Sequence, residues 1–290
     1  MAVTDARTAQ VESGLDQLDL PAIGTTPWPR RLARVTIPKL VAFGVLLGVW
    51  QLVYALKLQS SFIIPSPGDV WAALVLQWQK GNVTTAVSTS ILHGGEGYAL
   101  AVLIGTPLGL LVARVQVVRI AIGSLIAALQ SLPSVTWAPV GILWFGLSQT
   151  TILFVVVMGA LPSIAGGMVA AVDQIPPLLL RVGDAMGARG LARYRYIVLP
   201  AALPGYVAGL KQAWSFSWRS LMAAELIVNG GDLGLGLGQL LDTGRAQINM
   251  PLMLMSIGLI LAVGVLIDAL IFAPLDRGVR RRRGLSARLA

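Results

Sequence analysis

The sequence predicts an all-α membrane protein with six transmembrane helices and a short cytoplasmic helical segment between the fourth and the fifth. Hydrophobic residues make up 56% of the chain and charged residues only 12%, whereas soluble domains carry about 25% charged residues. A soluble protein of 290 residues could not cover its surface with so few charges. Apolar stretches of about 20 residues, the length that crosses a bilayer, recur along the chain.

The spans are separated by polar, Gly-rich or Pro-rich segments. A Pro-rich loop over 60–68 precedes a short interfacial helix over 69–80, which Asp69 is expected to cap. The third span is interrupted by two prolines, and a short helix is expected near 235–241 in the loop that follows the fifth span. The six predicted spans cover 37–56, 85–113, 120–145, 151–172, 201–228 and 252–273.

The distribution of basic residues predicts the orientation. Nearly all Lys and Arg residues outside the spans lie on the side of the two termini, and the other side holds Lys57, Lys80 and Arg245. Because cytoplasmic loops are enriched in Lys and Arg, both termini are predicted to be cytoplasmic. The predicted organisation is a cytoplasmic tail, a transmembrane domain and a basic cytoplasmic tail, at 1–35, 36–274 and 275–290.

Several classes of function are disfavoured by the composition. The chain has no Cys and one His, so thiolate chemistry and multi-His metal sites within one chain are excluded. The net charge of +9 sits at the edges of apolar segments and therefore indicates membrane topology, with no nucleic-acid binding. No phosphate-binding loop of the form G-x-x-x-x-G-K-[ST] is present, so ATP is not expected to bind this chain.

The cytoplasmic segment over 173–199 is too patterned to be a bare connector. Consecutive prolines suit a helix start near Pro177, and Gly187 and Gly190 are expected to end that helix. A second short segment leads to Leu199, where the fifth span begins. The pattern predicts a compact helix-turn-helix knob.

This knob resembles the coupling loop of bacterial ABC importer permeases. The family pattern is Glu-Ala-Ala, three residues, Gly, nine residues, Ile, one residue, and Leu-Pro. Gly187, Ile197, Leu199 and Pro200 occupy the corresponding positions, whereas 181–183 hold Arg, Val and Gly in place of Glu-Ala-Ala. Four further segments resemble the sulfonate, taurine and nitrate permease subfamily in the same order, at 62–74, 105–111, 128–146 and 199–227.

The resemblance implies a type I ABC importer permease fold and a permease subunit of the bacterial cytoplasmic membrane. Such a subunit is not an enzyme and holds no cofactor or metal. Two copies would form the pore, two separate ATPase subunits would hold ATP and Mg, and a periplasmic or lipid-anchored binding protein would deliver a small anionic solute such as a sulfonate. The residues expected to contact the ATPase are Val182, Ala185, Met186, Gly187, Ala188 and Arg189, with Leu199 and Pro200.

Charged residues inside the spans suggest a translocation pathway. Such groups are costly in a bilayer and usually face a cavity or a partner. The candidates for an anion pathway are Lys211, Trp214, Ser217, Trp218, Arg219 and Glu225. The alternatives are salt bridges with Glu225 or Glu96, snorkelling of the cations, and an interfacial position for Glu225. His93 and Glu96 are expected to share a helix face as an interfacial pair or a proton relay.

Competing functions remain open at this stage. A secondary transporter driven by an ion gradient would show an inverted internal repeat, which the sequence does not reveal convincingly. A membrane-embedded enzyme would need a cluster of His, Asp or Ser residues in the spans. Related permeases also carry nitrate, bicarbonate or vitamin precursors, and the sequence does not choose among these solutes.

Overall fold

The computed structural model describes residues 28–57, 60, 63–230 and 233–283, and every regular element among them is helical. The chain divides into two compact units, which separate between Leu56 and Lys57. The first contains helix α2, Trp28–Ala55. Within α2, Thr36–Ala55 is apolar and long enough to cross a membrane, and none of its side chains is buried in the protein. Such a helix suits lipid on all sides.

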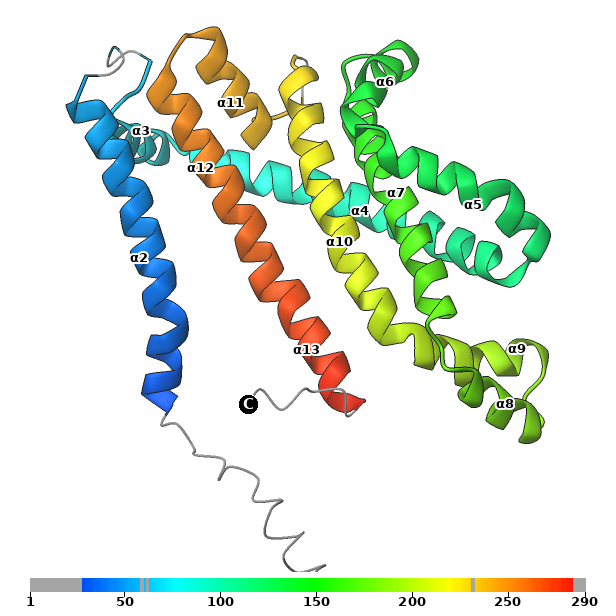
Figure 1. Ribbon diagram of the computed structural model, residues 1–290. Helices are drawn as coiled ribbons and strands as arrows, with labels where there is room; N and C mark the ends of the chain where they lie inside the picture. The colour runs from blue at the N-terminus through cyan, green and yellow to red at the C-terminus, as the bar shows by residue number, and fades with distance from the viewer. Residues whose placement is uncertain (1–27, 58–59, 61–62, 231–232, 284–290) are drawn as a thin grey trace, which may run out of the picture. The chain divides into compact units, whose positions relative to one another are not determined.

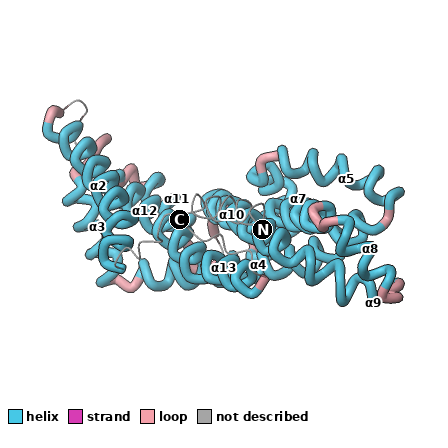
Figure 2. The backbone as a smooth tube through the Cα atoms, turned by 60° about the horizontal axis from the view of Figure 1, so that its bottom comes forward, coloured by secondary structure: helices cyan, strands magenta, loops and turns pink. Residues whose placement is uncertain are grey.

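The second unit contains the remaining helices, which short loops connect (Figures 1 and 2). They are α3 Pro67–Gln79, α4 Asn82–Arg114, α5 Gln116–Ser131, η1 Ser134–Trp137, α6 Ala138–Phe145, α7 Gln149–Asp173, α8 Pro177–Ala185, α9 Gly190–Arg193, η2 Tyr194–Val198, α10 Leu199–Ile227, α11 Leu237–Ala246, α12 Met250–Ile267, η3 Asp268–Phe272 and α13 Ala273–Arg282.

The start of α3 differs from the prediction. Ser66, not Asp69, is the N-cap residue, and its hydroxyl accepts a hydrogen bond from the Asp69 amide at 3.1 Å. The Asp69 carboxylate in turn accepts hydrogen bonds from the amide and hydroxyl of Ser66. This reciprocal capping box places the acidic residue three positions inside the helix, where it satisfies the cap amide.

Four helices among the described residues are long and apolar enough to cross a membrane, or five if a bent pair counts as one span. They correspond to α2, α4, α7 and the continuous segment Met250–Arg282. The bent pair is the predicted third span: α5 and the segment Ser134–Phe145 meet at 100°, at Pro133. By contrast, Pro162 lies inside α7 without ending it. The 29-residue α10 carries three charged residues and does not meet the same criterion.

Helix α7 is the centre of the core and packs against α4 and α10. Its buried side chains include Ile152, Val155 and Ile164, all fully inaccessible. Glycines bring the backbones close: a Cβ on Gly167 would lie 3.0 Å from the Cα of Gly209 on α10. Small residues at crossings are how membrane helices maximise contact without a hydrophobic driving force between them.

Candidate functional site

The predicted knob is a helix-turn-helix beside the first turn of α10, at the end opposite α11 (Figure 1). Helix α8 ends at Ala185, and Gly187 and Gly190 adopt φ values of +79° and +56°. The amide of Ala188 donates to the Gly183 carbonyl at 3.0 Å, which closes the turn around Gly187. The predicted helix break at these glycines is therefore confirmed.

Two contacts make the knob compact. A Cβ on Gly183 would lie 1.9 Å from Cδ1 of Ile197, so any larger residue would force the Ile197 side chain to move. Asp184 and Arg193 form an ion pair at 3.3 Å, which joins α8 to α9. Gly183 stands at the last Glu-Ala-Ala position of the coupling loop, and its absent side chain thus has a packing reason.

The knob carries an apolar surface that none of the described residues covers. Met186 is 82% exposed, Leu191 78%, Leu178 68% and Val182 47%. Apolar side chains this exposed are covered in the membrane by lipid or by another protein. Arg181 and Arg189 lie on the same segment, are exposed, and form no ion pair with any described carboxylate.

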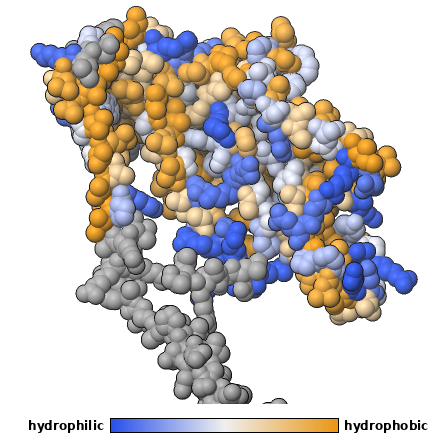
Figure 3. Space-filling view, viewed as in Figure 1, coloured by the Kyte–Doolittle hydropathy of each residue, from blue (hydrophilic) through white to orange (hydrophobic). Residues whose placement is uncertain are grey.

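We call the residues Leu178, Arg181, Val182, Met186, Arg189 and Leu191 the docking surface. Apolar and hydrophilic side chains adjoin at the end of the molecule that carries the knob (Figure 3). Ala185 is also exposed, whereas Ala188 is only partly so. Leu178 and Leu191 are not among the contact residues predicted from the sequence. Both are apolar residues in a segment that was predicted to be cytoplasmic, and this could have identified them.

An ion pair joins α5 to α7 close to the knob. Both terminal nitrogens of Arg119 donate to the Asp173 carboxylate, at 2.9 and 2.5 Å. The pair holds the end of α7, from which the chain enters the knob.

Helix α10 exposes a polar stripe. Gln212, Ser215 and Arg219 are exposed and lie at helical spacing on one face. The Arg219 Nε donates to the Ser215 carbonyl at 3.1 Å, and its guanidinium lies 4.6 Å from the centre of the Phe216 ring. Arg219 has no carboxylate partner among the described residues.

Lys211 is paired, but not as predicted. Its Nζ lies 3.0 Å from the carboxylate of Asp268, so the predicted salt bridge with Glu225 or Glu96 is wrong. Asp268 is an acidic residue within the predicted sixth span, and that position was the signal that could have identified it. The pair joins α10 to η3.

Trp214 and Trp218 are each only 7% exposed and pack inside the protein. Their rings stack at 6.1 Å, and Trp214 meets Tyr98 edge to face. Trp218 donates through Nε1 to the Ile260 carbonyl at 3.2 Å. Ser217 is fully buried on the same side. The structure thus separates Ser217 from the exposed stripe, whereas Trp214 and Trp218 line a mostly apolar hollow together with Arg219.

Glu225 is the most deeply buried charged residue, with no exposed surface. Its carboxylate accepts hydrogen bonds from the Ser90 hydroxyl at 2.7 and 2.9 Å and from the Gly238 amide at 3.0 Å. Nδ1 of His93 lies 3.3 Å away, and the Leu237 amide donates to the Ser90 oxygen at 2.8 Å. We call these groups the Glu225 cluster, which joins α4, α10 and the start of α11.

The cluster defines the surroundings of Glu225 and corrects the prediction for His93. Glu225 is completely enclosed by the protein, and its interfacial depth stays a prediction. His93 does not pair with Glu96; it is 4% exposed and faces Glu225, while the exposed Glu96 accepts a hydrogen bond from Gln149 at 2.9 Å. Although the two residues are three positions apart on α4, His93 faces α10 and Glu96 contacts the start of α7.

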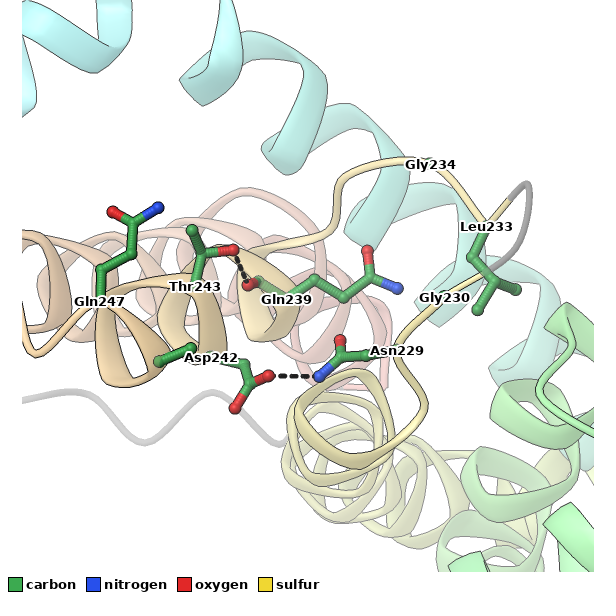
Figure 4. Close-up of a pocket in the computed structure, with 9 residues that line it drawn as sticks. Asn229, Gly230, Leu233, Gly234, Gln239, Asp242, Thr243 and Gln247 are labelled. Carbon is green, nitrogen blue, oxygen red and sulfur yellow. Dashed lines mark hydrogen bonds between the residues drawn. The ribbon is translucent and has the colours of Figure 1, made fainter.

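A polar hollow of about 340 Å³ lies beyond the Glu225 cluster, between the end of α10 and α11 (Figure 4). Asn229 donates to the Asp242 carboxylate across it, and the Thr243 hydroxyl donates to the Gln239 carbonyl at 2.9 Å. No group of three or more His, Cys, Asp or Glu side chains suited to a metal ion occurs among the described residues.

Several apolar helices, glycine-mediated crossings and a compact knob at one end define a multi-pass α-helical membrane protein. Residues 105–281 match the family of binding-protein-dependent transport system inner membrane components. The chain belongs to this family of ABC importer permeases, and its relatives include permeases named for nitrate, taurine and aliphatic sulfonate transport.

The chain is 27% identical over 243 residues to the nitrate import permease protein of Leptolyngbya laminosa, covering 82% of this chain and 86% of that protein. It is 26% identical to the taurine transport system permease protein of Escherichia coli K12, covering 71% and 76%. It is 28% identical to the riboflavin transport system permease protein of Chloroflexus aurantiacus, covering 83% and 90%. Among solved structures, an inward-facing MetNI methionine ABC transporter chain shares the fold, with a TM-score of 0.54, 22% identity and coverage of 74% and 99%.

Proposed function

We propose that this chain is the pore-forming subunit of an ATP-driven importer, and that the docking surface receives the force of a separate ATPase. The docking surface carries the proposal: its apolar side chains, up to 82% exposed, are costly to leave in water. A partner that covers them removes this cost. In this arrangement α10 is the fifth of six spans, the knob and both termini are cytoplasmic, and α11 lies on the outer side.

The assembly that follows has two copies of this chain and two ATPase subunits, which hold ATP and Mg. A periplasmic or lipid-anchored binding protein delivers the solute to the outer side, where the polar hollow between Asn229 and Asp242 offers hydrogen-bonding groups. The chain itself contributes no catalytic group and binds no cofactor. Residues 1–35 and 275–290 are assigned as cytoplasmic tails.

The geometry suggests how movement of the knob would reach the pore. Gly183 packs on Ile197 of η2, and η2 continues directly into α10 at Leu199 and Pro200. When ATP draws the two ATPase subunits together, the knob moves as one body and tilts α10. The other end of α10 is joined to α11 by the Glu225 cluster, so inner and outer ends move together.

A small anion is the solute class that the polar stripe favours. Arg219 is an exposed cation within α10 and has no carboxylate partner among the described residues, and a charged group at such a position faces a cavity or a partner. Relatives named for nitrate and taurine transport accord with this choice. A relative named for riboflavin transport makes a vitamin precursor the second candidate, and bicarbonate a third.

Uptake into proteoliposomes tests the proposal. Vesicles containing the chain and its ATPase should accumulate radiolabelled taurine or nitrate only with the loaded binding protein and internal ATP. An imposed proton or sodium gradient without ATPase should give no accumulation. Uptake driven by such a gradient alone would instead support a secondary transporter.

Substitution of Gly187 should uncouple ATP hydrolysis by the partner subunit from uptake of the solute. In Gly187→Val, a β-branched residue must adopt φ near +79°, which costs about 1–2 kcal/mol and distorts the turn. We expect normal membrane insertion, retained ATP hydrolysis and at least a fivefold loss of uptake. Gly81→Val is the matched control, because Gly81 also has positive φ and open surroundings but lies between α3 and α4. Equal uptake by the Gly187→Val and Gly81→Val variants would contradict a role of the knob in coupling.

A further inference from the structure

A hollow of about 260 Å³ with a mixed polar and apolar lining lies beside Arg219, between the break of the third predicted span, α7 and α10. It exists because α5 ends at Ser131 and the chain turns by 100° before it enters η1 and α6. Ser134 and Ser163 also line it. The hollow therefore places hydroxyl groups next to an exposed cation.

The donors around this hollow are not all used within the protein. Ser163 is 8% exposed, and its hydroxyl has no hydrogen-bond partner among the described residues. Ser134 is hydrogen-bonded to Ser220 at 2.7 Å. Because the single Ser220 proton goes to the Phe216 carbonyl at 2.7 Å, the Ser134 hydroxyl is the donor in this pair and its proton is used. Arg219 uses only Nε, for the Ser215 carbonyl. The two terminal nitrogens of its guanidinium remain free to donate.

None of the described residues that line the hollow is acidic. Asp268 borders a separate, mostly apolar hollow on the other side of Arg219 and is paired there with Lys211 at 3.0 Å. Gln130 donates to the Pro162 carbonyl at 2.8 Å and Ser131 to the Ala128 carbonyl at 2.7 Å. The unpaired donors among the described lining residues are the Ser163 hydroxyl and the terminal nitrogens of Arg219. They lie beside one positive charge and match an anion with several acceptor oxygens.

We propose that this hollow is a transit site for a small oxyanion, such as nitrate or the headgroup of a sulfonate. The proposal rests on the proposed function and names its substrate class. Arg219 lies eight residues from the end of α10 that carries α11, which is about 12 Å along the helix. An anion released on the outer side would meet Arg219 before it reached Lys211, about 12 Å further along the helix.

The chain has no native Cys, so one introduced thiol can report on the hollow. In Ser131→Cys, we compare modification by methanethiosulfonate ethylsulfonate, an anion, with modification by the ethyltrimethylammonium reagent, a cation. After correction for their rates with a free thiol, the anionic reagent should react about tenfold faster. Sodium methanesulfonate should slow this reaction, whereas an equal concentration of sodium gluconate should not.

Two variants identify the cause of the preference. Arg219→Gln in the Ser131→Cys background should abolish it, and Arg219→Lys should largely retain it. Thr136→Cys is the control for position, because Thr136 is exposed on η1 but does not line the hollow; it should show no preference. Equal rates for both reagents with Arg219 present would overturn the site, as would an unchanged preference in Arg219→Gln. Pairing of Arg219 with a carboxylate of the second copy would give the equal rates.

The labelling needs neither uptake nor ATP, so it separates this proposal from the proposed function. If the anionic preference holds but ATP-driven uptake fails, the transit site stands without the importer mechanism. In the reconstituted importer, Arg219→Gln should reduce uptake of nitrate or taurine at least tenfold while the loaded binding protein still stimulates ATP hydrolysis. Unchanged uptake by that variant would overturn the site even where the importer mechanism is correct.

Discussion

Replacing Glu225 with Ala is expected to lower the free energy of unfolding by about 3–5 kcal/mol, because the change leaves a buried hydrogen-bonded cluster without its acceptor. The Ser90 hydroxyl, the Gly238 amide and His93 would each lose a partner. The loss should appear as a large decrease in the melting temperature of the detergent-solubilised protein. Tryptophan fluorescence can follow it, since Trp214 and Trp218 are buried in the hydrophobic cluster that also contains Leu237, whose amide belongs to the Glu225 cluster.

The matched control for this prediction lies on α4. Glu96 is also a carboxylate, but it is exposed and contacts only Gln149, so Glu96→Ala should change the unfolding free energy by less than about 0.5 kcal/mol. Glu225→Gln should fall between the two, because an amide keeps the shape and one acceptor oxygen but turns a second acceptor into a donor. Similar melting temperatures for Glu225→Ala and Glu96→Ala would contradict the assigned cluster.

Loss of packing between α4 and α7 is the second large effect that we expect. A Cβ at Gly109 would lie 2.6 Å from the Ala165 carbonyl oxygen and 2.9 Å from its Cα. Because these are backbone atoms of a neighbouring helix, they cannot rotate away, and the two helices must separate. Gly109→Ala should therefore destabilise the protein by about 1–3 kcal/mol, as overpacking of a close contact does.

Gly95 provides the control within the same helix. A Cβ there meets nothing within 4 Å, so Gly95→Ala should be neutral or stabilising by up to about 1 kcal/mol through helix propensity. Thermal melting of both variants, with the fraction of monodisperse protein after solubilisation, checks the pair. If Gly109→Ala were as stable as Gly95→Ala, the close crossing of α4 and α7 would be wrong.

Local features of the sequence were sufficient to predict the helix-turn-helix structure of the knob. The positive φ of Gly187 and the helix break follow from the lack of a side chain, and a proline at the start of α8 has a local cause as well. The position of the third span's interruption was also foreseeable at Pro133. Each of these features is determined by residues that are close together in the sequence. Helix periodicity and the conformational preferences of Gly and Pro are therefore enough to predict them.

Partners across the fold were not foreseeable from one sequence. His93 and Glu225 are 132 residues apart and meet only because α4 crosses α10 beside the start of α11. The sequence offered Glu96 as the nearer partner of His93, and it offered Glu225 or Glu96 for Lys211. Which charged groups meet inside a bundle depends on helix rotation, which the period of 3.6 residues does not fix between helices.

Cross-linking from one cysteine at the docking surface tests the central claim most directly, namely that this knob receives a separate ATPase in the cytoplasm. Met186 is 82% exposed, and the chain has no other thiol, so Met186→Cys gives one defined reporter. We expect an impermeant maleimide to label it only in inside-out vesicles, and a short bifunctional maleimide to join it to the co-purifying ATPase subunit. Labelling from the outer face, or capture of no ATPase under conditions that support uptake, would contradict the account.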